Sequence, residues 1–297
     1  MKSVTPIFTG NKTYAYRDPA CIYARGMYNL FFTLSQKENG YMYNFVAMSQ
    51  SRDLKNWSEP RILTPKDKSL NFTSPGSILK VGDEYVITVC SYPMPKPYAE
   101  YPYADDSARI YTMRTKDFVE FTYPQIIMAK ADTSVAEMGR MIDAFIFEDK
   151  DEDGRYHMFF KQDGKIAVSH SDNLADWNFE GVADGGENPC VIVKDNFYYL
   201  IYSPNEDGIA FKRSCDLKTW EDMGVTTLAR ESWHFASGRI TAGFAMEAPC
   251  HTGYRYILFF HGSVADSHPE THGEASVAFV FTDDFQNFYS DTNSLKR

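Results

Sequence analysis

The chain has 297 residues, of which 43% are hydrophobic and 24% charged, and its formal net charge is −10. An acidic chain without a Lys/Arg-rich run argues against a nucleic-acid partner, because affinity for phosphates depends on basic side chains. The chain has no apolar run of 18 residues, so we expect no transmembrane helix and no membrane partner. Its first residues lack the apolar segment of a signal peptide, which predicts a cytoplasmic protein, or a periplasmic or secreted one whose signal peptide has been removed. Five Cys at irregular spacing predict free thiols instead of a disulfide framework.

A short motif recurs five times along the chain. Its pattern is Ser or Thr, any residue, Asp or Asn, Leu or Phe, two further residues, and Trp or Phe. The copies lie at 51–57, 115–121, 171–177, 214–220 and 282–288. The polar first and third positions favour a turn, because such side chains bond to the nearby backbone. The Leu or Phe and the final aromatic residue should then pack against a sheet.

A second motif precedes each copy and consists of an apolar strand, a tight polar turn and an aromatic strand. The turns are at 24–26, 81–83, 152–154, 194–196 and 252–253. Turns between such strands predict hairpins. Each unit therefore supplies about four strands. Five such units predict an all-β fold, a five-bladed β-propeller with four-stranded blades, in which residues 1–297 form one domain.

Four of the five units open on an acidic residue, namely Asp18, Asp143, Glu187 and Glu247, and the remaining unit opens on Ser74. The first strand of each propeller blade lines the central channel, so the residues that open these strands should converge at one end of it. Hydrolysis of a glycosidic bond requires a proton donor to the leaving oxygen and a second carboxylate as base or nucleophile. A further carboxylate nearby can raise the pKa of the donor.

These segments, taken in order, resemble a known family. They are Arg17-Asp18-Pro19, Met141-Ile142-Asp143-Ala144, Gly186-Glu187-Asn188-Pro189 and Ala248-Pro249-Cys250-His251. With the recurring turns, they make nearly the whole chain similar to the five-bladed propeller glycoside hydrolases, and most similar to family 43. The chain departs from the family pattern in having Asp143-Ala144 where Asp-Pro is usual and Glu187-Asn188-Pro189 where Glu-Gly-Pro is usual.

The resemblance implies roles for three carboxylates. Asp18 would be the general base, Glu187 the general acid, and Asp143 the residue that keeps Glu187 protonated, in an inverting mechanism. The implied substrate is an oligosaccharide derived from a plant or microbial polysaccharide, of arabinofuranoside, xyloside or galactoside type. No cofactor would be required, and calcium or another cation could occupy the central channel, where His251 would meet it. A core position is the alternative for His251, and we expect His261 to be structural.

Other residues are candidate sugar contacts. Arg17 and Ser74 adjoin the carboxylate positions, and Glu247 is also the alternative to Glu187 as the acid. Trp233 and His234 lie outside the repeats, between the fourth and fifth units. The Tyr- and Pro-rich segment 92–103 either walls the pocket or packs as a simple loop.

Two other functions remain open at this point. One is a fructosyl- or anhydrosugar-acting hydrolase on the same scaffold. The other is a propeller that binds glycans without turnover, against which the three carboxylates argue, because binding alone does not require them.

Overall fold

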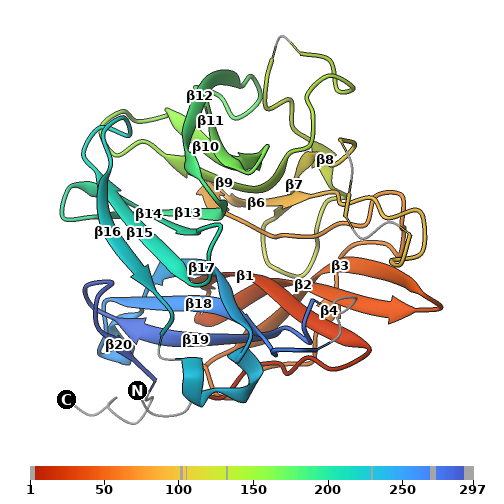
Figure 1. Cartoon of the computed structure of the whole chain (residues 1–297). Coiled ribbons are helices and arrows are strands. Elements are labelled where there is room, and N and C mark those ends of the chain that lie inside the picture. The colour runs from red at the N-terminus through yellow and green to blue at the C-terminus, as the bar shows by residue number, and fades with distance from the viewer. Residues whose placement is uncertain are drawn as a thin grey trace.

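The computed structural model describes residues 4–100, 103–104, 106–131, 133–228, 230–267 and 272–290. These residues form five four-stranded antiparallel sheets, each following chain order from its inner to its outer strand. The sheets are arranged radially (Figure 1). This arrangement confirms the predicted five-bladed β-propeller.

The strands take equivalent places in the five blades. The first strands contact one another around the central channel and are β1 (Tyr14–Ala24), β5 (Ile78–Val81), β9 (Ile142–Glu148), β13 (Glu187–Lys194) and β17 (Arg239–Glu247). The second strands are β2 (Met27–Glu38), β6 (Glu84–Cys90), β10 (Tyr156–Gln162), β14 (Phe197–Ser203) and β18 (Tyr256–Ser263). The third strands are β3 (Tyr41–Ser51), β7 (Ile110–Thr115), β11 (Lys165–Ser171), β15 (Ile209–Ser214) and β19 (Ser276–Thr282). The outer strands are β4 (Arg61–Ile62), β8 (Gln125–Ile126), β12 (Asn178–Gly185), β16 (Glu221–Thr226) and β20 (Phe288–Tyr289).

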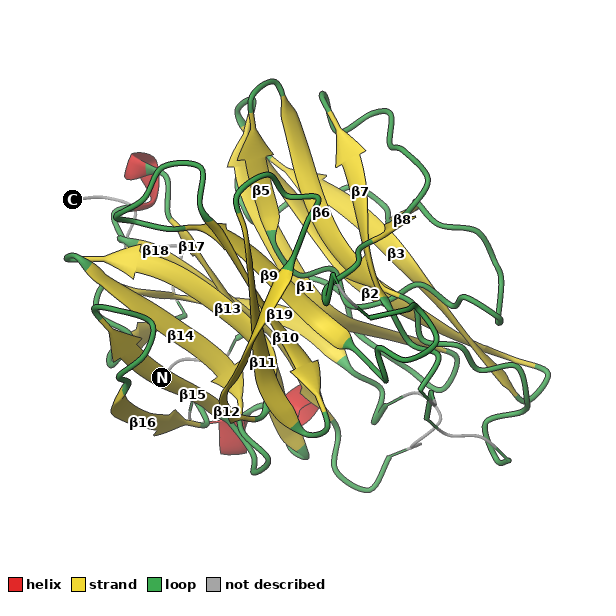
Figure 2. Ribbon diagram, turned by 90° about the horizontal axis from the view of Figure 1, so that it is seen from above, coloured by secondary structure: helices red, strands yellow, loops and turns green. Residues whose placement is uncertain are grey.

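Helical structure is restricted, among the described residues, to the short 3-10 turns η1 (Arg230–Ser232), η2 (His234–Ala236) and η3 (Cys250–Thr252). Figure 2 shows how strongly strands dominate the molecule. None of the helices in this part of the chain has the length and apolar character to cross a membrane. All five Cys are free thiols, as predicted.

The aromatic second strands form much of the core. Consecutive Phe residues such as Phe31-Phe32, Phe159-Phe160 and Phe259-Phe260 are fully buried. Both faces of these strands are covered because each blade packs between two neighbours, which explains why the sequence shows apolar runs here instead of alternation. Burying a Phe side chain stabilises a fold by roughly 1.5–3 kcal/mol, so these pairs contribute much of the cohesion between blades.

The recurring motif forms the same turn between the third and fourth strand of each blade. In the first copy, Ser51 Oγ accepts the N–H of Leu54 at 3.0 Å, and Asp53 Oδ1 accepts the N–H groups of Lys55 and Asn56 at 2.9 and 2.8 Å. These bonds hold Leu54 at a φ of +63°, which non-glycine residues rarely adopt. The residues at the same place in the other copies, Phe118, Leu174, Leu217 and Phe285, also have a positive φ.

The N-terminal segment joins the first blade to the last. Ile7 N–H donates to the carbonyl oxygen of Val277 at 2.7 Å, and Gly10 N–H donates to Ser276 Oγ at 2.9 Å. Both acceptors lie on β19 of the fifth blade. These bonds close the ring of blades between its two ends.

Each blade also has one residue with left-handed backbone where its inner segment enters the channel. These residues are Asp18, Ser74, Asp143, Asn188 and Ala242, with φ between +48° and +56°. In β1, β13 and β17 the pairing register shifts at this residue, as expected for a β-bulge.

The bulges correct one part of the predicted repeat. Glu247 does not open the fifth blade but is the last residue of β17, paired with Tyr256. The equivalent place in that blade belongs to Thr241 and Ala242. The sequence-based alignment was therefore shifted along the fifth blade.

Close contact between inner segments makes Gly76 hard to replace. A Cβ at this position would lie 1.9 Å from the carbonyl oxygen of Ala144 in the next blade and 2.7 Å from Thr88 Oγ1. We expect Gly76→Ala to lower the free energy of unfolding by about 3 kcal/mol, because backbone would have to shift. The matched control is Gly185→Ala, whose new Cβ would meet only Asn205 at 3.8 Å. Urea denaturation measures both, and equal stability of the two variants would contradict the close approach.

Candidate active site

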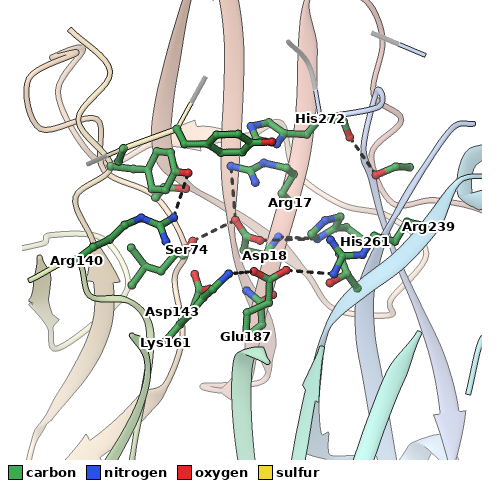
Figure 3. Close-up of a pocket in the computed structure, with 18 residues that line it drawn as sticks. Arg17, Asp18, Ser74, Arg140, Asp143, Lys161, Glu187, Arg239, His261 and His272 are labelled. Atoms are coloured by element: carbon green, nitrogen blue, oxygen red, sulfur yellow. Dashed lines mark hydrogen bonds and ion pairs between the residues drawn. The ribbon is translucent and has the colours of Figure 1, made fainter. Parts of the chain in front are cut away.

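A pocket of about 550 Å³ opens at one end of the central channel. Asp18, Asp143 and Glu187 all line it, as do Arg17 and Ser74 (Figure 3). The first, third and fourth blades supply the three carboxylates. The structure thus brings together five of the residues selected from the sequence, at the predicted end of the inner strands.

Asp18 is buried and is held by neutral donors. Thr33 Oγ1 donates to Asp18 Oδ2 at 2.8 Å, and the Ser74 hydroxyl donates to the same oxygen at 3.4 Å. The nearest cation is Arg17, whose Nη2 lies 3.9 Å from this oxygen. An ionised carboxylate that is positioned by hydroxyl groups and lines an open pocket can accept a proton from a bound water molecule.

Asp143 favours its protonated form. Burial raises the pKa of Asp143, the negative charge of Glu187 raises it further, and the pKa reaches about 7 even though Lys161 lowers it. Two neighbouring carboxylates cannot both ionise readily, so one of them retains a proton near neutral pH.

Glu187 favours its ionised form. It forms ion pairs with Lys161 of β10 and with Arg239 of β17, the latter at 3.2 Å. Figure 3 shows the two cations reaching the carboxylate from different sides. Burial alone would raise the pKa of Glu187, but the two cations outweigh burial and lower it.

The direction of the pKa shift at Glu187 differs from the sequence-based expectation. Asp143 was expected to keep Glu187 protonated, but the pKa of Glu187 is lowered and that of Asp143 is raised. The reason is the pair of cations, Lys161 and Arg239, which the sequence did not place beside Glu187.

His261 lines the pocket and also has the structural role expected of it. Its Nδ1 atom accepts the N–H of Asp18 at 3.1 Å, which places the ring proton on Nε2. Burial lowers the pKa of His261 to about 4, and nearby Arg17 and Arg239 lower it too while Asp18 opposes them. Burial likewise lowers the pKa of His272, which also lines the pocket.

Four predicted residues lie elsewhere. Trp233 is buried and stacks on Phe235 with ring centroids 6.0 Å apart, so it belongs to the core. His234 is exposed on η2 and does not line the pocket. Glu247 lines a separate hollow at the opposite end of the channel. His251 is exposed on η3, with its Nε2 atom 3.2 Å from the Tyr28 hydroxyl.

The predicted cation finds no matching ligands. Across the described ranges, no group of three or more His, Cys, Asp or Glu side chains is arranged to hold a metal ion. His251, the expected ligand, is engaged by an aromatic hydroxyl group and lies away from the carboxylates.

The sequence analysis missed Lys161, Arg239 and Arg140, all of which line the pocket. Lys161 had a detectable signal, because a charged residue directly follows the buried aromatic run of β10. Arg239 could have been recognised only if the sequence of β17 had been aligned correctly with the first strands of the other blades. Two residues of the Tyr-rich segment, Tyr92 and Tyr103, line the pocket, whereas Tyr101 lies outside the described residues.

One family model matches residues 33–195 and is described as a "probable glycosyl hydrolase domain", related to family 43. The match covers more than half of the chain and includes Asp143 and Glu187. No curated protein matches the chain in sequence.

Solved structures of glycoside hydrolases share the fold. An exo-β-1,3-galactanase from Clostridium thermocellum superposes with a TM-score of 0.66 at 16% identity over 96% of this chain and 64% of its own. A xylan β-1,4-xylosidase from Bacillus halodurans gives 0.62 at 15% identity over 95% and 56%. An exo-1,5-α-L-arabinanase from a bovine ruminal metagenomic library gives 0.63 at 14% identity over 95% and 99%. This chain thus spans under two thirds of the galactanase and the xylosidase, and at these identities the likeness concerns the fold.

The raised pKa of Asp143 predicts a pH-dependent stability difference. The unfolded chain loses this proton near pH 4 and the folded chain near pH 7, so ionising Asp143 destabilises the fold progressively as pH rises between these values. Asn cannot ionise. We expect Asp143→Asn to gain stability relative to the wild type by about 2–4 kcal/mol between pH 4 and pH 8, measured by urea denaturation.

Asp53→Asn is the matched control. Backbone N–H groups, chiefly that of Asn56, lower the pKa of Asp53. The stability that this ionised group contributes is present above pH 4 and is lost as pH falls, so the trend for Asp53→Asn should have the opposite sign. A difference between wild type and Asp143→Asn that does not change with pH would contradict the protonation of Asp143.

Proposed function

The chain belongs to the family described as a "probable glycosyl hydrolase domain", and from this membership we propose that it hydrolyses a glycosidic bond by inverting acid–base catalysis in the pocket. The observation that carries the proposal is the convergence of Asp18, Asp143 and Glu187, from three different blades, on one pocket. Two carboxylates that face one pocket, one as the base and one as the proton donor, are what this reaction needs.

Asp18 acts as the general base in this mechanism. Thr33 and Ser74 orient its carboxylate without neutralising it. It takes a proton from water while the water oxygen bonds to the anomeric carbon. The bond from that carbon to the leaving oxygen breaks in the same step.

Glu187 acts as the general acid and receives its proton from the carboxyl group of Asp143. A substrate oxygen that accepts a hydrogen bond from Arg239 competes with Glu187 for this partly exposed cation. Weakening the ion pair raises the pKa of Glu187, because less positive charge then stabilises the carboxylate. The proton passes to Glu187, which delivers it to the leaving oxygen. The products are a sugar hemiacetal and the released alcohol, and solvent restores the proton.

The substrate is an oligosaccharide of arabinofuranoside, xyloside or galactoside type, from a plant or microbial polysaccharide. Support comes from the similar folds of a galactanase, a xylosidase and an arabinanase. The pocket volume of about 550 Å³ also lies in the range of small-molecule sites.

Replacing the proposed base and acid should affect different substrates differently. We expect Asp18→Asn to reduce kcat/KM about 10²–10⁴-fold on every substrate, since a general base contributes this much. Glu187→Gln should cause a similar loss on oligosaccharides but a much smaller loss on 4-nitrophenyl glycosides, whose leaving group needs little protonation. A screen of aryl arabinofuranosides, xylosides and galactosides, followed by steady-state kinetics, measures both.

Glu247→Gln provides the control for Glu187→Gln, because Glu247 lies at the opposite end of the channel. It should keep kcat/KM within about twofold of wild type, as surface substitutions usually do. Normal turnover by Glu187→Gln together with a large loss in Glu247→Gln would refute the assignment of the acid.

The stereochemical course is a separate prediction. Direct attack by water, without a covalent intermediate, gives a first-formed product of inverted anomeric configuration. Proton NMR during the first minutes of hydrolysis distinguishes the anomers before mutarotation. Retention of configuration would show that a carboxylate acts as nucleophile.

A further inference from the structure

Among the residues that the structure describes, the pocket lining carries more positive than negative side chains, although the protein as a whole is negatively charged. The positive residues are Arg17, Arg140, Lys161 and Arg239, against three described carboxylates. One of those, Asp143, has a pKa raised to about 7 and is largely neutral below that pH. Because the whole chain has a net charge of −10, this local excess of cations is not a general property of its surface.

Two of the four cations have no close carboxylate partner among the described residues. Lys161 and Arg239 pair with Glu187, whereas the carboxylate contact of Arg17 is Asp18 at 3.9 Å, the outer limit of an ion pair. Arg140 has no ion pair within the described ranges and instead donates from Nη2 to the Tyr92 hydroxyl at 3.2 Å.

Both arginines also have unused donors. The Nε atoms of Arg17 and Arg140 are buried and make no hydrogen bond in the described part of the chain. A buried donor without an acceptor is unfavourable, so these groups gain free energy when a ligand supplies one. Arg140 also lies over the Tyr92 ring, 5.4 Å from the centroid, which fixes the plane of its guanidinium group.

The two guanidinium groups lie toward the same side of the carboxylates. Figure 3 shows Arg17 above Asp18 and Arg140 on the other side of Ser74, so that a ligand above the carboxylates would face both. The neighbouring histidines, His261 and His272, are neutral. Arginine is suited to this role because its planar group offers parallel donors to a carboxylate or sulfate.

We propose that the pocket binds a sugar with a negatively charged substituent, a carboxylate or a sulfate ester, which Arg17 and Arg140 recognise. The proposal rests on the proposed function in taking this pocket as the substrate site, and it narrows the substrate class to acidic glycans. Among the described residues, a neutral sugar would leave Arg140 without a counter-charge and Arg17 with only its 3.9 Å contact to Asp18.

The experiment compares sugars that differ in one substituent. The probes are galactose, galacturonate and galactose 6-sulfate, with the corresponding glucose series, and isothermal titration calorimetry measures their binding to the full chain. At least one acidic sugar should bind about tenfold more tightly than its neutral counterpart, since a charge-assisted contact contributes roughly this much. The preference should shrink as sodium chloride increases from 20 to 300 mM. The carboxylate and sulfate arms show which anion is favoured.

Variants test the assigned residues. Arg17→Met and Arg140→Met should each lower the affinity for the acidic sugar more than the affinity for neutral galactose, so that the preference for the acidic sugar shrinks. Arg140→Lys, which keeps the charge but loses the planar group, should retain part of the preference. Arg114→Met removes an exposed positive charge outside the pocket and should change nothing. Thermal unfolding verifies that each variant is folded.

The outcomes separate this proposal from the proposed function. Hydrolysis of neutral aryl glycosides with no tighter binding of any acidic sugar would overturn the charge recognition and leave the hydrolase standing. Selective binding of acidic sugars without hydrolysis of any glycoside would overturn the proposed hydrolase function and support the charge recognition. Equal affinity for all probes, no binding of any acidic probe, or a preference that survives in both Met variants would each reject the role of Arg17 and Arg140.

Discussion

The architecture of the site depends on a hydrogen bond that four of the five blades provide to the left-handed residue of the next. A residue with positive φ leaves its N–H outside the strand ladder, and a buried N–H requires an acceptor. In these four interfaces the acceptor is a side chain of the preceding blade's second strand. The pairs, acceptor first, are Thr33 with Ser74, Cys90 with Asp143, Ser203 with Ala242, and His261 with Asp18. These bonds fix the residues that enter the channel mouth.

The interface between the third and fourth blades is the exception, and it creates the electrostatic asymmetry of the site. Lys161 stands at the acceptor's place, but an ammonium group can only donate. It therefore reaches the carboxylate of Glu187, the residue before the bulge. Together with Arg239, Lys161 lowers the pKa of Glu187, whereas burial and the charge of Glu187 raise that of Asp143. Asp18 and Asp143 occupy equivalent positions, and Glu187 lies one residue before the equivalent Asn188.

The sequence was sufficient for the fold and for the three carboxylates, because hairpins, recurring turns and acidic blade openings are local patterns. It failed in the fifth blade for a physical reason. The segment Glu247-Ala248-Pro249 imitates Glu187-Asn188-Pro189, whereas the true bulge at Ala242 has neither an acid nor a proline to mark it.

The ion pairs of Glu187 could not be predicted from local patterns, because they are contacts between blades. Lys161 and Arg239 belong to the third and fifth blades, and the packing of these blades against the fourth brings both to Glu187. The pKa of Glu187 therefore depends on side chains of the third, fourth and fifth blades together. A ligand that draws Arg239 away weakens the ion pair with Glu187 and raises the pKa of Glu187. The proton then shifts from Asp143 toward Glu187, since the two carboxylates compete for one proton. Under the proposed mechanism, substrate binding and formation of the acid are then one coupled event.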